Sequence, residues 1–253
     1  MRFRAFSAWR TLVSLLALGA IVGGCAGNGV LKREYEYEEE LYLALDGSAT
    51  LNVNASVASL VALRGANLDP DPRARIDRER VRALFEGEGA RASISLARRR
   101  SRRFVHVSVR VDDLRTLSRL APFAWSSYRF DRRGDHVEFR QTVGPPGGGR
   151  TASVQWTGDE VVAFRVHLPS QVLSHNSPSG RIERGNILEW EQPLAERLAG
   201  RTLHIAINLG RESILYTTLI LFGASIVAAG VTLTLVIWWI ARRGRRSEVT
   251  EAA

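Results

Sequence analysis

The chain has 253 residues and a formal net charge of +9, and its single cysteine excludes a disulfide within the chain. The charge is concentrated at the two ends, because residues 1–10 carry +3 and residues 242–253 carry +2, which leaves +4 for the residues between them. Since these terminal arginines are typical of targeting and topology signals, the net charge does not indicate nucleic-acid binding, and no nucleic-acid partner is expected.

The first predicted element is a secretory signal sequence at residues 1–24. Three arginines precede an uncharged stretch from Thr11 to Gly24, which is the usual order of a basic region and an apolar region. Small residues lead directly to Cys25, so the run resembles the lipobox at which bacterial lipoproteins are diacylated and cleaved. We therefore expect Cys25 to be lipidated. The alternative is an uncleaved signal anchor, although fourteen uncharged residues are short for crossing a bilayer.

The exported domain is predicted to span residues 25–212 and to begin with a half-buried strand. Between positions 34 and 45, glutamates at even positions alternate with tyrosines and leucines at odd positions, and this period of two predicts one solvated face. The glutamates are then spread along that face, so no metal site is expected. Asp46 and Gly47 turn the chain, and the next apolar residues are again odd-numbered, which requires a three-residue loop with a bulge.

The segments that follow predict an α+β domain with mostly antiparallel hairpins and two or three short helices. One helix is expected from Val57 to Gly65, and a second over the segment IDRERVRALFEGEG. A third short helix is expected to begin at Asp112 or Asp113 and to stop at Pro122. Further hairpins are expected over residues 90–111, over 128–139 around Arg133-Gly134 and over 154–166 around Gly158-Asp159, with a last strand at 202–209.

The tip of the hairpin at residues 90–111 is rich in arginine. Its arginines are Arg98, Arg99, Arg100, Arg102 and Arg103. Near an anionic membrane surface each basic residue contributes on the order of 1 kcal/mol, so these five are candidates for contact with lipid headgroups. The alternative is a solvated turn whose charges discourage pairing with the edge strand of another molecule.

A transmembrane helix is predicted at residues 213–241, followed by a cytoplasmic basic tail at 242–253. No charged residue occurs in the 28 positions from Ile214 to Ala241, and a helix of that length crosses a bilayer at about 1.5 Å per residue. Aromatic and basic residues that favour the membrane interface mark its two ends. These anchors are Tyr216, Trp238, Trp239, Arg242, Arg243, Arg245 and Arg246.

No arrangement of residues in the sequence points to catalysis. The metalloprotease, nucleophile-elbow and phosphate-loop motifs are missing, and the five histidines fall in separate predicted strands and one loop. Asp112 and Asp113 are explained more simply as a helix start than as a pair of acids. We therefore expect a protein that is not an enzyme and has no cofactor, and no catalytic, cofactor-binding or metal-binding residue is assigned.

The order of these features resembles the LppM-like family of bacterial envelope lipoproteins. The matching signals are the lipobox cysteine, the segment LDGSATLNVNAS, the late segment HLPSQVLSHNSPSGRIERGNILEW, the last strand and the membrane helix with its arginine tail. The resemblance covers most of the chain, and none of these signals is catalytic. It implies a lipid-anchored exported domain with a further membrane helix and, from the fold of the family, a role in binding lipophilic molecules.

Two membrane anchors, the lipid on Cys25 and the C-terminal helix, would hold the exported domain close to one membrane. We therefore expect a protein of the cell (inner) membrane whose extracytoplasmic domain binds membrane lipid or another envelope molecule. The alternative is a non-enzymatic interaction or scaffold module with an envelope protein as its partner. For that function the helices and the HNSPSG loop are the candidate surfaces.

Overall fold

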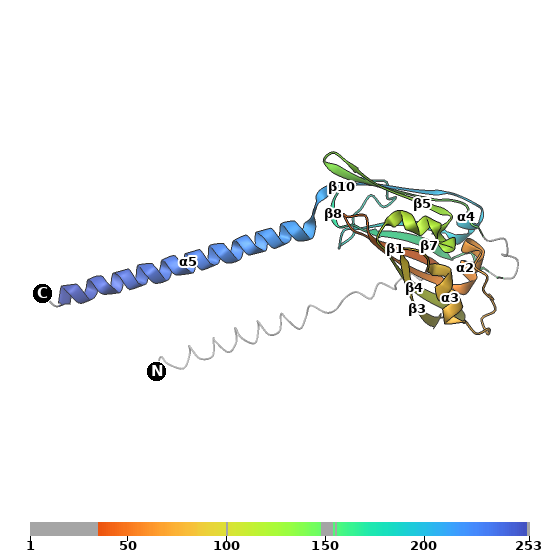
Figure 1. The fold of residues 1–253 in the computed structure, drawn as a ribbon, viewed down its shortest axis with the longest axis horizontal. Coiled ribbons are helices and arrows are strands. Elements are labelled where there is room, and N and C mark those ends of the chain that lie inside the picture. The colour runs from red at the N-terminus through yellow and green to blue at the C-terminus, as the bar shows by residue number, and fades with distance from the viewer. Residues whose placement is uncertain (1–34, 100, 148–153, 155, 252–253) are drawn as a thin grey trace, which may run out of the picture. The chain divides into compact units, whose positions relative to one another are not determined.

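The computed structural model describes residues 35–99, 101–147, 154 and 156–251. In this part of the chain two sheets, a few short helices and one long C-terminal helix form a mixed fold of the predicted α+β class (Figure 1). The six-stranded sheet has the spatial order β3 (Ala90–Arg99), β4 (Arg102–Val111), β2 (Ala49–Ser56), β1 (Tyr37–Leu43), β7 (Val161–His167) and β9 (Ile187–Pro193). The four-stranded sheet has the order β5 (Ser126–Arg133), β6 (His136–Val143), β10 (Leu203–Ser213) and β8 (Ser170–His175). The helices are α2 (Val57–Arg64), α3 (Arg78–Phe85), α4 (Leu194–Leu198) and α5 (Ile214–Glu251), with 3-10 segments η2 (Leu114–Arg119) and η3 (Ala121–Phe123).

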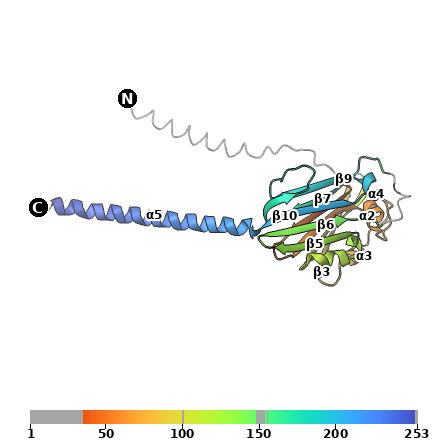
Figure 2. The same cartoon turned by 90° about the horizontal axis from the view of Figure 1, so that it is seen from above.

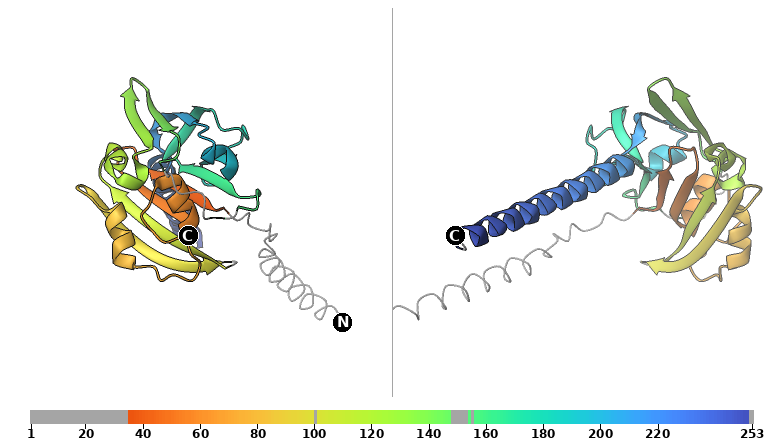
Figure 3. Two further views of the ribbon diagram at one scale, coloured as in Figure 1. Left: turned by 90° about the vertical axis from the view of Figure 1, so that its right-hand side faces the viewer. Right: turned by 60° about the vertical axis from the view of Figure 1, so that its left-hand side comes forward.

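The two sheets share one hydrophobic core, and Figure 3 shows them from two further directions. Every second residue of β4 from Val105 to Val111 is buried, as its sequence period predicts. The four-stranded sheet adds the buried side chains of Phe139 and Ile207. All the residues of α2 except its last are buried as well, so this helix packs inside the domain.

The hairpin of β1 and β2 has the loop that the residue parity predicts. Leu41 pairs with Leu51, which are both odd-numbered. The backbone N–H of Ala44 donates to the carbonyl oxygen of Ser48 at 3.0 Å, so residues 45–47 form a three-residue loop. Gly47 has a φ of 94°, a conformation that favours glycine. The predicted register of this hairpin is therefore confirmed.

The even-numbered glutamates in and just before β1 are not on a solvated face, so that expectation is wrong. Glu38 is 4% exposed, and Glu36 and Glu40 are half-buried. The guanidinium of Arg165 on β7 pairs with Glu38 and lies 3.5 Å from a carboxylate oxygen of Glu40 and 2.6 Å from that of Glu189 on β9. The period of two shows which side chains share a face. It does not show that β7, which is distant in sequence, places an arginine among them.

The first two predicted helices are confirmed with local capping contacts. The side chain of Ser56 accepts a hydrogen bond from the backbone N–H of Ser59 at the start of α2, and Gly65 ends this helix with a φ of 63°. The side chain of Asp77 accepts from the backbone N–H groups of Glu79 and Arg80 at the start of α3. Short-range capping contacts therefore set the start of both helices and the end of α2.

Two other predicted elements differ from the structure. The third helix is a pair of 3-10 segments, η2 with Asp113 as its N-cap and η3 with Pro122 inside it. The hairpin expected at 154–166 is not formed, because Val154 and Trp156 lie outside strands. Strand β7 instead pairs with β1 in parallel and with β9 in antiparallel orientation, so both of its edges are occupied.

Strand β10 is longer than predicted and runs directly into α5. Ser213 is the last residue of β10 and Ile214 is the first residue of α5. Ser213 pairs with Ser170, and the backbone N–H of Ile214 donates to the carbonyl oxygen of Pro169 at 3.2 Å. No linker therefore separates the sheet from the helix, and the connection is part of the hydrogen-bonded strand pairing.

The strand registers define two opposite ends of the domain. The junction end carries Ser213, the turn between β5 and β6, and the loop between β1 and β2, because His136 pairs with Gly210 and Tyr42 pairs with His167. The far end carries the first residues of β1, β4 and α2, and α4 also lies there (Figure 2). At about 3.3 Å per residue, the ten residues of β4 separate the two ends by roughly 30 Å.

Candidate ligand site at the far end

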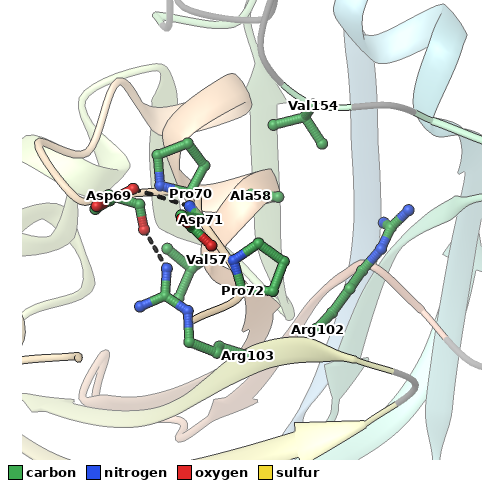
Figure 4. A pocket seen from close by; sticks show the side chains of 9 residues that line it. All are labelled: Val57, Ala58, Asp69, Pro70, Asp71, Pro72, Arg102, Arg103 and Val154. Atoms are coloured by element: carbon green, nitrogen blue, oxygen red, sulfur yellow. Dashed lines mark hydrogen bonds between the residues drawn. The ribbon is translucent and has the colours of Figure 1, made fainter. Parts of the chain in front are cut away.

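The far end of the domain contains a hollow of about 700 Å³. Its walls come from the first residues of α2, from the loop after α2 and from the first residues of β4, as Figure 4 shows. The residues that line it are Val57, Ala58, Asp69, Pro70, Asp71, Pro72, Arg102, Arg103 and Val154. This volume falls in the range of small-molecule sites in proteins, and it combines an apolar lining with a few charged groups. We call it the far-end hollow.

Arg103 forms a buried charged wall of this hollow. The residue is 6% exposed and donates from Nη1 to the carbonyl oxygen of Ala74 at 2.8 Å and from Nη2 to that of Asp69 (Figure 4). Burial lowers the pKa of the Arg103 guanidinium, and the carboxylates of Asp69 and Asp71 oppose this shift. These hydrogen bonds hold the loop after α2 against β4, and Arg103 places a positive charge in the lining of the hollow.

Arg102 forms the neighbouring wall and is held by two carboxylates. Its Nη1 lies 2.7 Å from Oε1 of Glu36, and its Nη2 lies 3.2 Å from Oε1 of Glu160. The guanidinium carbon is also 5.2 Å from the centre of the Trp156 ring, within cation–π range. Since neighbouring residues of a strand point to opposite faces, Arg102 and Arg103 leave β4 in different directions (Figure 4).

Glu160 is kept ionised by backbone hydrogen bonds. The N–H of Thr157 donates to its Oε1 at 2.8 Å, and the N–H of Gly158 donates to its Oε2 at 2.9 Å. Burial by itself would raise the pKa of Glu160, but these backbone donors outweigh it, and the pKa is lowered. An ionised Glu160 therefore pairs with Arg102 at neutral pH and holds the segment before β7 against β4.

A second pair of arginines lies in the core at the far end. Arg64 of α2 pairs with Glu39 and donates from Nε to the hydroxyl oxygen of Tyr37 at 3.0 Å. The guanidinium carbons of Arg64 and of Arg197 on α4 lie 3.3 and 4.9 Å from the centre of the Trp125 ring. Burial lowers the pKa of each guanidinium to about 10, so both remain charged at neutral pH. This arginine–tryptophan cluster fixes α2, α4 and the start of β5 relative to one another.

The sequence interpretation missed this cluster. Arg64 and Glu39 are 25 positions apart, and Trp125 and Arg197 come from two further segments. A local signal was present, because Arg64 is the one charged residue of the predicted helix that begins at Val57. That signal shows that the arginine needs a partner, but it does not identify Glu39 or the aromatic face.

The structure gives the five predicted headgroup contacts different environments. Arg98 and Arg99 are exposed, and Arg100 lies outside the described residues. Arg102 is half-buried and Arg103 is buried, and both line the far-end hollow. Contact with lipid headgroups stays a prediction for this tip, and the register places the tip at the opposite end of the domain from α5.

The predicted interface anchors lie on α5. Within the described chain, the segment Ile214–Ile240 is long and apolar enough to cross a membrane, and the side chains described for it are exposed. Tyr216, Trp238 and Trp239 are exposed on this helix, and the guanidinium carbon of Arg242 lies 5.0 Å from the centre of the Trp238 ring. The remaining predicted anchors, Arg243, Arg245 and Arg246, belong to the same helix.

The predicted signal sequence and the predicted lipidation site, Cys25, lie outside the described residues. Lipidation therefore stays a prediction from the sequence. The first described residue, Tyr35, is ten positions after Cys25.

Comparison with known proteins gives a weak similarity of fold. No protein-family model matches the chain, and no curated protein matches it. A solved structure that is similar is the NMR structure of the folded domain of LppM from Mycobacterium tuberculosis, at 13% sequence identity and a TM-score of 0.37. The match covers 73% of this chain and 95% of that one. Membership of a family does not follow from a similarity at this level.

Proposed function

We propose that this chain is a non-enzymatic binding protein of a bacterial cell envelope. In this proposal α5 anchors it in the inner membrane, the domain is extracytoplasmic, and the far-end hollow holds an amphipathic envelope molecule. The observation that carries the proposal is the hollow itself, which offers about 700 Å³ with apolar and charged walls. Lipidation of Cys25 would add a second anchor in the same membrane.

The lining of the hollow supports an amphipathic ligand. Val57, Ala58 and Pro70 offer apolar surface, against which a hydrocarbon segment would pack. Val57 and Ala58 are also the first two residues of α2, where backbone N–H groups and the helix dipole favour negative charge. Arg103 adds a fixed guanidinium to the lining. Because Asp69 and Asp71 also line the hollow, its polar part carries charges of both signs. A ligand with an apolar body and a polar or zwitterionic group matches these contacts.

The position of the hollow limits how far from the anchoring membrane the protein can bind its ligand. The hollow and Ser213 are separated by roughly 30 Å of sheet, the length of β4. Because β10 continues into α5 without a linker, the domain cannot move far from its membrane. The proposed ligand is therefore a molecule encountered within a few nanometres of the anchoring membrane.

Native mass spectrometry of the full chain, extracted from bacterial membranes in detergent, tests this function. The parent protein is expected to carry a copurifying amphipathic molecule. Ala58→Phe fills the hollow and is expected to lose that molecule. Ala124→Phe places the same side chain at an exposed position outside the hollow and is expected to keep it. Repeated preparations without a bound molecule, or equal retention by both variants, would contradict the proposal.

A further inference from the structure

A second hollow, of about 630 Å³, lies at the junction end of the domain. Its lining residues are Asp135, Gln171, Gly210, Arg211 and Glu212. They come from the turn between β5 and β6, from β8 and from the last residues of β10. We call it the junction hollow. It is distinct from the far-end hollow, because the two are at opposite ends of the sheets.

The junction hollow is fixed directly beside the start of the apolar helix. Glu212 is two residues before Ile214, and the strand pairing at Ser213 leaves no flexible segment between them. Arg211 donates from Nη1 to the carbonyl oxygen of Gly134 at 2.8 Å, which holds the β5–β6 turn against β10. If α5 crosses a membrane as proposed above, this hollow lies at the level of the lipid headgroups.

The charged groups of the junction hollow have both signs. Arg211 supplies a guanidinium, and its hydrogen bond to Gly134 uses one of the N–H donors of that group. The other N–H donors can therefore bind a phosphate. Asp135 and Glu212 supply two carboxylates, and Gln171 supplies a primary amide. A hydrogen bond with His136, together with the charge of Arg211, lowers the pKa of Asp135, so this carboxylate is ionised at neutral pH.

We propose that the junction hollow binds the headgroup of an aminophospholipid of the anchoring membrane. The phosphodiester contacts Arg211, and the primary ammonium contacts Asp135 and Glu212. The acyl chains of the same lipid then run along the exposed apolar surface of α5. This inference rests on the membrane anchoring in the proposed function, but not on any ligand of the far-end hollow.

The same chemistry disfavours the other common headgroups. A quaternary choline has no N–H to donate to the carboxylates, so it forfeits their hydrogen bonds. A glycerol headgroup carries the phosphate charge without an ammonium, and Asp135 and Glu212 then add repulsion without compensation. Arg211 by itself would favour an anionic lipid. The two carboxylates beside it are therefore what determines the preference.

The test is lipid retention by the full chain reconstituted in nanodiscs of equal parts phosphatidylethanolamine, phosphatidylglycerol and phosphatidylcholine. After transfer to detergent, native mass spectrometry counts the lipids that remain bound. The parent chain is expected to enrich phosphatidylethanolamine by about threefold, the size expected of one or two exposed ion pairs. The double variant Asp135→Asn and Glu212→Gln is expected to lose this enrichment. Arg211→Gln is expected to lower retention of all three lipids.

Matched controls come from the far end of the domain. Arg201 and Glu196 form an ion pair at the surface, at 3.0 Å, so Arg201→Gln removes one positive charge and Glu196→Gln removes one negative charge away from the junction hollow. Both are expected to keep the enrichment. Ala58→Phe is also expected to keep the phosphatidylethanolamine enrichment, although it is expected to lose the ligand of the far-end hollow. The two proposals can therefore fail independently of one another. Equal retention of the three lipids by the parent, or enrichment that survives the double variant, would overturn the inference.

Discussion

At the scale of single residues, arginines organise the far end of the domain through partners that are distant in sequence. Arg64 combines a buried carboxylate, a tyrosine hydroxyl and the face of Trp125. Arg103 instead binds carbonyl oxygens of the loop after α2. Arg103 therefore fixes one wall of the far-end hollow, and Arg64 fixes α2, which supplies another. Removal of either Arg64 or Glu39 would leave the other charge buried without compensation.

The ion pair of Arg64 and Glu39 allows a direct test of this view. Breaking a buried pair by removing one partner costs about 3–5 kcal/mol. Arg64→Met and Glu39→Leu are each expected to lower the free energy of unfolding by that order. The double variant is expected to lose less than the sum of the two. Urea unfolding of the full chain in detergent, followed by tryptophan fluorescence, measures this, and single losses below about 1 kcal/mol would count against it.

Glu160 predicts a specific pH dependence of stability. Its pKa is lowered in the folded chain by the N–H groups of Thr157 and Gly158, which outweigh burial. An ionised Glu160 therefore stabilises the fold at neutral pH, and this contribution is lost as the pH falls below the ordinary value of the group and through the lowered one. Glu160→Gln is expected to lower the thermal midpoint at pH 7, with a difference from the parent that shrinks as the pH falls below about 4.5, the ordinary pKa of this carboxyl group. A difference that stays constant would refute the assignment.

At the scale of elements, local sequence signals determine where the hairpins and helices form. Which strands pair with one another is determined by contacts between residues that are distant in sequence. The parity of β1 and β2 and the caps of α2 are short-range signals, and these elements form as predicted. The parallel pairing of β1 with β7 joins residues 37–42 to residues 162–167, which no period in the sequence indicates. Because the pairing of β7 with β1 was not predicted, β1 was expected to have a solvated face, and a hairpin was expected at residues 154–166.

Gly47 tests the loop between β1 and β2. Its φ of 94° is unfavourable for a residue with a Cβ, whereas the space around it admits one, with the nearest atom of Phe130 at 3.5 Å. Gly47→Ala is therefore expected to lower the free energy of unfolding by about 1 kcal/mol through backbone strain. Gly147→Ala serves as the control, because a Cβ there has open space and the backbone is not in the left-handed region. An equal effect of the two substitutions would contradict the strain.

At the scale of the whole molecule, the candidate site is less predictable than the anchor. A charge-free stretch of 28 residues indicates a membrane helix without knowledge of any contact. The far-end hollow depends on how three separate segments meet at Arg103, and the tip arginines alone do not predict which of them turn inward. The direct passage from Ser213 to Ile214 was also not predicted, because the expected strand ended four residues earlier.

Both proposals depend on the direct connection of β10 to α5. With α5 in a membrane, as proposed, this connection would place the end with Ser213 at that membrane and the far end away from it. Fluorescence quenching in nanodiscs tests it most directly. The full chain would carry Cys25→Ser and a single labelled cysteine, either Asp135→Cys at the junction end or Arg99→Cys at the far end, with spin-labelled lipid headgroups as quenchers. Strong quenching at position 135 and little at position 99 is the predicted result. Equal quenching at the two positions, or stronger quenching at 99, would contradict it and would favour the headgroup contact that the sequence predicts for the arginine-rich tip.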